Sequence, residues 1–193
     1  SSTFGRWLEE LDTAAALVAR TKAAQPVGAE EINRLPDEYQ APIRELQAEL
    51  APQFTSDSLW TPQGDPSTYL SQIVARHPGK VVFVDFWATW CGPCNLGIKE
   101  MEKVKADLEA QGVVFVYITD NSSSTKGFLE MKRKHKGEHY IFTKDDWKKM
   151  QIPGYEGAIP HYLIYGKNGQ LKQTVVGWPG LENMKENILN ANK

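Results

Sequence analysis

Apolar residues in the first quarter of the chain recur every three or four positions, which is the spacing of an amphipathic helix. The first stripe comprises Phe4, Trp7, Leu8, Leu11, Ala15 and Val18, and the second comprises Tyr39, Ile43, Leu46 and Leu50. Pro26-Val27-Gly28 is expected to end the first helix, and Pro52 follows the second. Such stripes usually face a core, so we expect them to pack on one another or on the rest of the chain. An interface with a partner, or with sequence upstream, is the alternative.

Residues 53–66 have the composition of a linker or loop, being rich in Pro, Ser, Thr, Gln and Asp. Ser67 is then expected to cap a short helix that ends at His77-Pro78-Gly79. The apolar residues of that helix are Tyr69, Leu70, Ile73 and Val74. We therefore expect a helical N-terminal segment over residues 1–52, a linker or loop over 53–66 and a domain over 67–193.

The pattern changes to that of a β-strand after Lys80. The run from Val81 to Trp87 is almost continuously apolar, which is typical of a central strand covered on both faces. A helix is expected from about Gly92 to Gly112, with Ile98, Met101, Val104 and Leu108 along one side. The next elements expected are a strand over 113–119, a helix through Phe128 and Met131, a strand over 140–142 and a helix over 145–150.

Two strand-like runs near the C-terminus, 162–165 and 171–176, are separated by Gly166-Lys167-Asn168-Gly169. An Asn-Gly pair between such runs is a strong signal for a β-hairpin. A final helix is expected over about 181–190. Parallel strands joined by helices, followed by an antiparallel hairpin, predict an α/β layered domain.

Composition and charge argue against two classes of function, nucleic-acid binding and membrane insertion. The 193 residues include 22 basic and 24 acidic side chains, which leaves a net charge of −2. A nucleic-acid surface would need a clear basic excess, and no apolar run reaches the roughly 18 residues of a membrane span. We therefore expect neither nucleic-acid binding nor stable membrane insertion of this segment. The chain does not begin with Met and shows no signal peptide, so we expect an export signal or anchor to have been removed.

The chain has only two cysteines, Cys91 and Cys94. A disulfide scaffold uses more cysteines, and a closed zinc site needs four ligands, so this pair is predicted to be redox-active. Cys91 falls where a strand ends and a helix begins, and the free N–H groups of a helix N-terminus stabilise a thiolate there. Cys91 is therefore expected to be the nucleophile, with Cys94 resolving the mixed disulfide. Gly92 and Pro93 suit the tight turn between them.

Asp85 interrupts an otherwise apolar strand. Burial should raise the pKa of its carboxyl, and an acid with a pKa near neutrality can exchange a proton with Cys94. The alternative is a buried structural carboxyl whose hydrogen bonds are satisfied. Pro160, after Ile159, is the third candidate, although most X–Pro bonds are trans and the sequence pattern alone does not favour a cis bond here.

The segment Val84-Asp85-Phe86-Trp87-Ala88-Thr89-Trp90-Cys91-Gly92-Pro93-Cys94 resembles the active-site segment of thioredoxins. The Ala-Thr-Trp-Cys form resembles the extracytoplasmic TlpA/ResA-like branch of that superfamily, as does the strand–helix insert near 140–150. Ala158-Ile159-Pro160-His161 falls where the family has its cis-proline strand. The resemblance covers roughly residues 65–193 and implies a thioredoxin-like three-layer α/β fold with a central mixed sheet, preceded by the N-terminal helical segment.

The resemblance assigns roles to residues. Cys91 would be the attacking thiol, Cys94 the resolving thiol, Asp85 the buried acid and Pro160 a cis-proline beside the pair. The backbone of Ile159 would pair with an extended substrate, and Trp87 and Trp90, with Gly92 and Pro93, would border the site.

Three departures from the pattern stand out. Gly92-Pro93 is the dipeptide of thioredoxin itself and suggests a reducing potential. No lysine occurs in the strand next to Asp85, where thioredoxins often have one. His161 stands where a small Thr or Ser is common, and it is expected to be a bystander.

We therefore expect a thiol–disulfide oxidoreductase located outside the cytoplasm, in the periplasm, that reduces disulfides in partner proteins. No metal or organic cofactor is expected. A thiol electron donor must re-reduce the pair, and a membrane thiol relay is the usual one in this branch. A disulfide-forming oxidase using the same site is the alternative within the class. A partner-binding module with an inactive cysteine pair is the alternative outside it.

Overall fold

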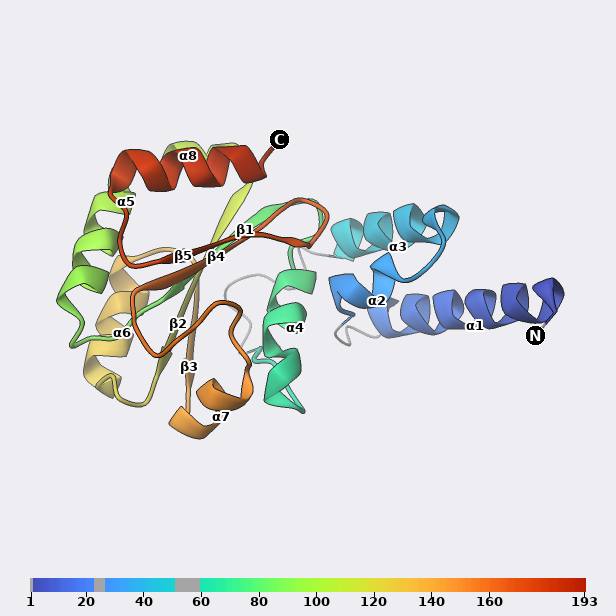
Figure 1. Ribbon diagram of the computed structural model, residues 1–193, viewed down its shortest axis with the longest axis horizontal. Coiled ribbons are helices and arrows are strands. Elements are labelled where there is room, and N and C mark those ends of the chain that lie inside the picture. The colour runs from blue at the N-terminus through green and yellow to red at the C-terminus, as the bar shows by residue number, and fades with distance from the viewer. Residues whose placement is uncertain (1, 23–26, 51–59) are drawn as a thin grey trace.

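A computed structural model describes residues 2–22, 27–50 and 60–193 (Figure 1). The N-terminal helices are α1 (Thr3–Lys22), α2 (Ala29–Asn33) and α3 (Asp37–Leu50). A 3₁₀ turn (Pro66–Thr68) leads into α4 (Tyr69–Ala75), β1 (Val81–Phe86), α5 (Gly92–Ala110), β2 (Val113–Asp120) and α6 (Thr125–Lys134). The chain continues through β3 (Glu138–Phe142), α7 (Lys144–Lys149), β4 (His161–Tyr165), β5 (Leu171–Val176) and α8 (Leu181–Ala191).

The strands form one mixed sheet in the order β3-β2-β1-β4-β5. β1, β2 and β3 are parallel, whereas β4 is antiparallel to both β1 and β5. All six residues of β1 are buried, as expected for the central strand of the apolar run. Helices cover both faces, with α5, α6 and α8 on one side and α4 and α7 on the other (Figure 1). This arrangement confirms the expected thioredoxin-like α/β fold.

The predicted elements of this part of the chain are found with small differences at their ends. The Asn168-Gly169 hairpin joins β4 to β5, and Thr143 caps α7 by accepting a hydrogen bond from the backbone N–H of Asp146 at 3.0 Å. The cap before α4 differs from the prediction. Asp65, and not Ser67, accepts the capping bond, from the Ser67 N–H at 3.0 Å, because the helix is entered through a 3₁₀ turn.

The N-terminal helices form a small core of their own, made of Ala14, Leu17, Val27, Ile32, Leu35 and Ile43. The prediction that the first apolar stripe is buried is wrong: five of its six residues are exposed and Val18 is half-buried, while the buried positions of α1 are Ala14, Leu17 and Thr21. Phe4, Trp7, Leu8 and Leu11 are 67%, 46%, 40% and 39% exposed. The first turns of α1 project beyond the start of α3, so no described residue covers them (Figure 1). Helical spacing shows which side chains share a face, but not whether another element is present to cover it.

Part of the expected linker, 53–59, lies outside the described residues, as does the expected helix end at Pro26. From residue 60 onward the chain packs on α4. The guanidinium of Arg76 lies 4.2 Å from the Trp60 ring centroid, and the side-chain carbonyl of Gln72 accepts a hydrogen bond from the Gln63 N–H at 3.0 Å. In the described part of the chain, no helix combines the length and apolarity needed to cross a membrane.

Candidate redox-active site

The two cysteines lie at the start of α5, where β1 has just ended. Cys91 is the N-cap residue of the helix, and its Sγ accepts a hydrogen bond from the Cys94 N–H at 3.2 Å. The two form a disulfide, with Cys91 4% and Cys94 0% exposed. Pro93 lies in the first turn, where backbone N–H groups have no acceptor within the helix, so the missing N–H of proline costs no hydrogen bond. The free N–H groups of this turn are placed to stabilise a thiolate on Cys91 when the bond is reduced.

A second segment, distant in sequence, completes the rim of the site. The Ile159–Pro160 peptide bond is cis, as the resemblance implied. The Ile159 carbonyl oxygen lies 3.9 Å from Cys91 Sγ. The Pro160 carbonyl accepts a hydrogen bond from the Gly177 N–H at 2.9 Å, which ties this segment to the end of β5.

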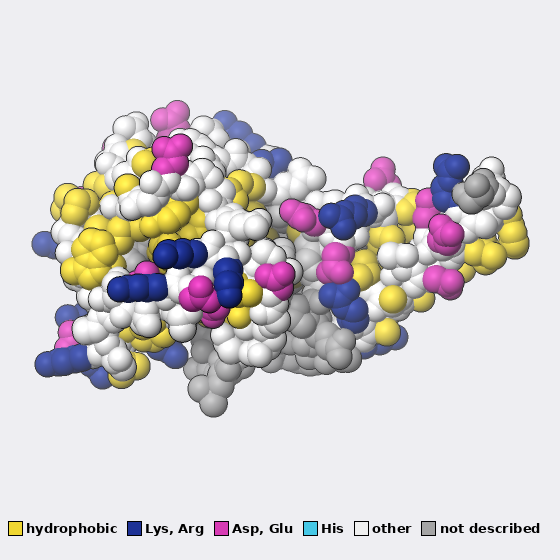
Figure 2. Space-filling view, turned by 60° about the horizontal axis from the view of Figure 1, so that its bottom comes forward, with side chains coloured by type: hydrophobic (Ala, Val, Ile, Leu, Met, Phe, Trp, Pro, Cys, Tyr) yellow, Lys and Arg dark blue, Asp and Glu magenta, His cyan; other side chains and the backbone are white. Residues whose placement is uncertain are grey.

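The rim around the disulfide is largely apolar and open. Trp90 is 64% exposed, Pro93 is exposed and Ile159 is half-buried. Hydrophobic side chains gather at the end of the domain farthest from the N-terminal helices (Figure 2). Trp87 differs from Trp90, because it is buried in the core beneath the site and does not border it from the surface.

The loop after β2 holds the active-site segment in place. The Trp90 indole N–H donates to Ser122 Oγ at 2.9 Å, and the Thr89 N–H donates to Ser123 Oγ at the same distance. Neither serine was predicted to belong to the site. Parallel strands place their carboxyl ends at one edge of a sheet, so the serines that follow β2 could have been assigned to the site from the predicted β1–β2 pairing.

Asp85 is buried beneath α5, at 1% exposure. Its neighbours two positions away, Phe83 and Trp87, belong to the core cluster that contains both cysteines, so Asp85 faces the same side. Burial raises the pKa of the Asp85 carboxyl well above its usual value. Tyr117 and Tyr162 flank it across the sheet, one on each neighbouring strand.

A lysine of α5 is buried against Tyr117, the neighbour of Asp85 on β2. Lys105 of α5 is 3% exposed, and its Nζ donates to the Tyr117 hydroxyl at 3.0 Å. A buried ammonium therefore lies beyond Tyr117 as seen from Asp85. Lys105 was not predicted to have a role, because an isolated lysine on an amphipathic helix gives no sign that its ammonium is buried.

His161 is buried but points away from the cysteines. Its Nε2 lies 2.7 Å from the Pro153 carbonyl oxygen, and its ring packs near Phe86 and Tyr155 in the cluster on the other face of the sheet. Adjacent residues of a strand face opposite sides, so the neighbour Tyr162 takes the cysteine side. His161 therefore anchors the loop before β4 and does not touch the disulfide.

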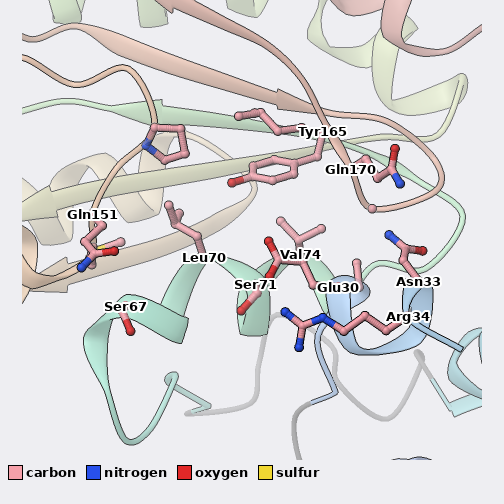
Figure 3. Close-up of a pocket in the computed structure, with 15 residues that line it drawn as sticks. Glu30, Asn33, Arg34, Ser67, Leu70, Ser71, Val74, Gln151, Tyr165 and Gln170 are labelled. Carbon is pink, nitrogen blue, oxygen red and sulfur yellow. The ribbon is translucent and has the colours of Figure 1, made fainter. Parts of the chain in front are cut away.

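A groove of about 730 Å³ lies elsewhere, between α2, α4 and the β4–β5 hairpin. Leu70 and Val74 of α4 lie on one side of it, with Tyr165 and Gln170 on the hairpin side (Figure 3). Neither cysteine lines it, and neither does Asp85. The thiol chemistry therefore belongs to the start of α5 and not to this groove.

Comparison with known proteins agrees with this geometry. The Redoxin family profile matches residues 47–188. A thioredoxin from Staphylococcus aureus is 32% identical over 106 residues, which cover 55% of this chain and 77% of that protein. The crystal structure of a thiol:disulfide interchange protein of the thioredoxin family from Chlorobium tepidum TLS aligns with a TM-score of 0.54 and 25% identity, over 61% of this chain and 83% of that one. The chain belongs to the Redoxin family of the thioredoxin superfamily and is a thioredoxin-like thiol–disulfide oxidoreductase.

Proposed function

We propose that this protein reduces disulfides in extracytoplasmic partner proteins, with Cys91 attacking and Cys94 resolving. The observation that carries the proposal is the position of Cys91 Sγ. It caps α5, beneath an open apolar rim, with the Ile159 carbonyl 3.9 Å away. Cys91 is the more accessible of the two sulfurs, which suits the attacking role.

The reaction proceeds by two exchanges. The Cys91 thiolate attacks one sulfur of the substrate disulfide, forms a mixed disulfide and releases the other substrate sulfur as a thiolate. Cys94 then attacks Cys91 Sγ, releases the reduced substrate and leaves the Cys91–Cys94 disulfide. In this second step Asp85 takes the proton of the Cys94 thiol. A thiol donor, for which a membrane thiol relay is our candidate, returns two electrons and re-forms the dithiol.

Substrate binding is assigned to the rim. The cis bond before Pro160 presents the backbone of Ile159 beside the sulfur, where an extended polypeptide can pair with it. Trp90, Gly92 and Pro93 supply the exposed surface on the other side of the disulfide. An exposed apolar rim favours a protein substrate over a small charged thiol compound.

The extracytoplasmic setting is supported by the Ala-Thr-Trp-Cys segment and by the β3–α7 insert, both of which resemble the TlpA/ResA-like branch. We also propose that residues 67–193 form the redox domain and that 1–52 form an appended helical segment joined to it through 53–66.

The test is the reduction potential of the cysteine pair, measured by equilibration with dithiothreitol or glutathione buffers followed by thiol trapping. A value near that of thioredoxin, about −270 mV, supports a reductase, whereas one near that of DsbA, about −120 mV, makes the protein an oxidase. Cys91→Ser should abolish exchange, and Cys94→Ser should accumulate the mixed disulfide on Cys91. A wild-type pair that does not exchange would contradict the enzymatic assignment and favour a binding module.

A further inference from the structure

Three buried polar atoms beneath α5 have no hydrogen-bond partner among the described residues: Asp85 Oδ1, Trp87 Nε1 and the Tyr162 hydroxyl oxygen. They lie on the side of the sheet that faces both cysteines. Buried polar groups in folded proteins are almost always hydrogen-bonded, so each exception needs an explanation. The proposed mechanism uses Asp85, but it gives Tyr162 no role.

Tyr162 stands directly beside the acid. Asp85 on β1 and Tyr162 on β4 are opposite each other in the antiparallel register, so their side chains share one face of the sheet. Tyr162 is 0% exposed. Burial and then the Asp85 charge raise the pKa of Tyr162 far above its usual value. The phenol therefore keeps its proton and remains a hydrogen-bond donor.

The position of the hydroxyl is fixed by its surroundings. A Cβ added to Gly97 would lie 2.8 Å from the Tyr162 oxygen, so the hydroxyl occupies the space that this glycine leaves. Gly97 follows Cys94 by three residues in α5 and lies on the same side of the helix. The Tyr162 ring stacks on Phe83 with 5.5 Å between centroids. The hydroxyl is thus held between the acid and the helical turn that carries the resolving cysteine.

We propose that Tyr162 is a positioning residue for the proton step, and that its hydroxyl donates a hydrogen bond to the Asp85 carboxylate across one water molecule. This inference rests on the proposed function. When Cys94 attacks the mixed disulfide, its thiol proton moves to Asp85, which becomes neutral, while Tyr162 keeps its own proton throughout. A hydrogen bond to the ionised carboxylate favours that form of Asp85 and so lowers its pKa. Tyr162 therefore extends toward lower pH the range in which Asp85 can accept a proton.

Tyr117 provides the matched comparison, because it flanks Asp85 on the opposite side. Its hydroxyl already accepts a hydrogen bond from Lys105, and it stacks on His139 with 4.8 Å between centroids. α8 contributes apolar side chains to the cluster around the acid, among them Met184 and Ile188. The other titratable groups that face Asp85, Tyr117 or Lys105 are Cys94, Glu102, Glu109, His135, Lys136 and His139.

The experiment compares Tyr162→Phe with Tyr117→Phe. The Asp85 carboxyl is titrated by NMR in reduced protein labelled with ¹³C at the aspartate carboxyl carbon, and Asp85→Asn identifies the signal. We expect Tyr162→Phe to move the Asp85 midpoint upward by on the order of one pH unit, the effect of one hydrogen bond to a charged group. Resolution of a Cys91 mixed disulfide near neutral pH should slow by about threefold to tenfold for the same reason. Tyr117→Phe should leave the midpoint in place.

An inert hydroxyl gives a different result. If the hydroxyl is unpaired, replacing it by hydrogen should leave the free energy of unfolding unchanged or raise it, and the midpoint of the Asp85 titration should not move. That outcome in a folded Tyr162→Phe protein overturns the inference, as does an equal shift in both variants. The carboxyl titration does not depend on turnover. A wild-type protein that fails to exchange thiols would therefore contradict the proposed function without deciding the hydrogen bond.

Discussion

Replacing Asp85 by asparagine removes a buried charge while keeping the size of the side chain, and this should stabilise the folded protein at alkaline pH. Asp85 is 1% exposed, and its Oδ1 has no protein partner among the described residues. An unpaired buried polar group costs about 1–3 kcal/mol, and a charged one costs more. We therefore expect Asp85→Asn to raise the free energy of unfolding by at least about 1 kcal/mol where the wild-type carboxyl is ionised.

The pH dependence has a definite sign. An aspartate titrates near about pH 3.9 in an unfolded chain, whereas burial raises the pKa of Asp85 in the folded protein. Between these two pKa values the folded form binds more protons, so the stability of the wild type falls as the pH rises. The stabilisation of Asp85→Asn should thus be small near about pH 4 and should reach its full size only above the folded pKa.

The assay is urea unfolding of the oxidised protein across this pH range, since the disulfide cysteines do not titrate. Asp107→Asn is the control, because Asp107 is exposed on α5 and the substitution makes the same chemical change in solvent. A variant less stable than the wild type above about pH 8, or a difference independent of pH, would refute the reasoning and show that the contacts of the Asp85 carboxylate, the proposed bond from Tyr162 included, outweigh the cost of burying its charge. Asp85→Asn should also slow the reduction of a model disulfide while the fold is retained.

Two further changes test the packing of the site, and a third tests a buried ion pair elsewhere in the domain. Gly97→Ala places a Cβ 2.8 Å from the Tyr162 oxygen and should lower the free energy of unfolding by about 1–3 kcal/mol. An unchanged midpoint of thermal or urea unfolding would show that the tyrosine can move aside. Ser122→Ala removes the acceptor of the Trp90 indole, so we expect altered tryptophan fluorescence and a several-fold lower kcat/KM for a protein disulfide; unchanged values would exclude a positioning role. Glu138→Gln breaks the buried ion pair with Arg76, which follows α4, and should lower the free energy of unfolding by about 3 kcal/mol. High salt should not lower the stability of the wild type by a similar amount, because the pair is shielded from solvent.

The local sequence determined the elements and the chemical centre of this protein. The apolar run of β1 specifies a central strand, the Asn168-Gly169 pair specifies a hairpin, and the spacing of Cys91 and Cys94 at a strand–helix junction specifies a redox pair. These signals lie within a few residues of one another, so backbone geometry and helical or strand period are sufficient to interpret them.

Only the tertiary structure decided which distant residues meet that centre. The Ile159 carbonyl beside Cys91, the serines that hold Trp90, and the hydroxyl of Tyr162 in the space left by Gly97 all join segments that are far apart in the chain. The exposure of the first turns of α1 was likewise decided by where α3 begins. The physical reason is the same in each case: periodicity assigns a residue to a face, but the element that packs on that face is chosen by the folding of the whole chain.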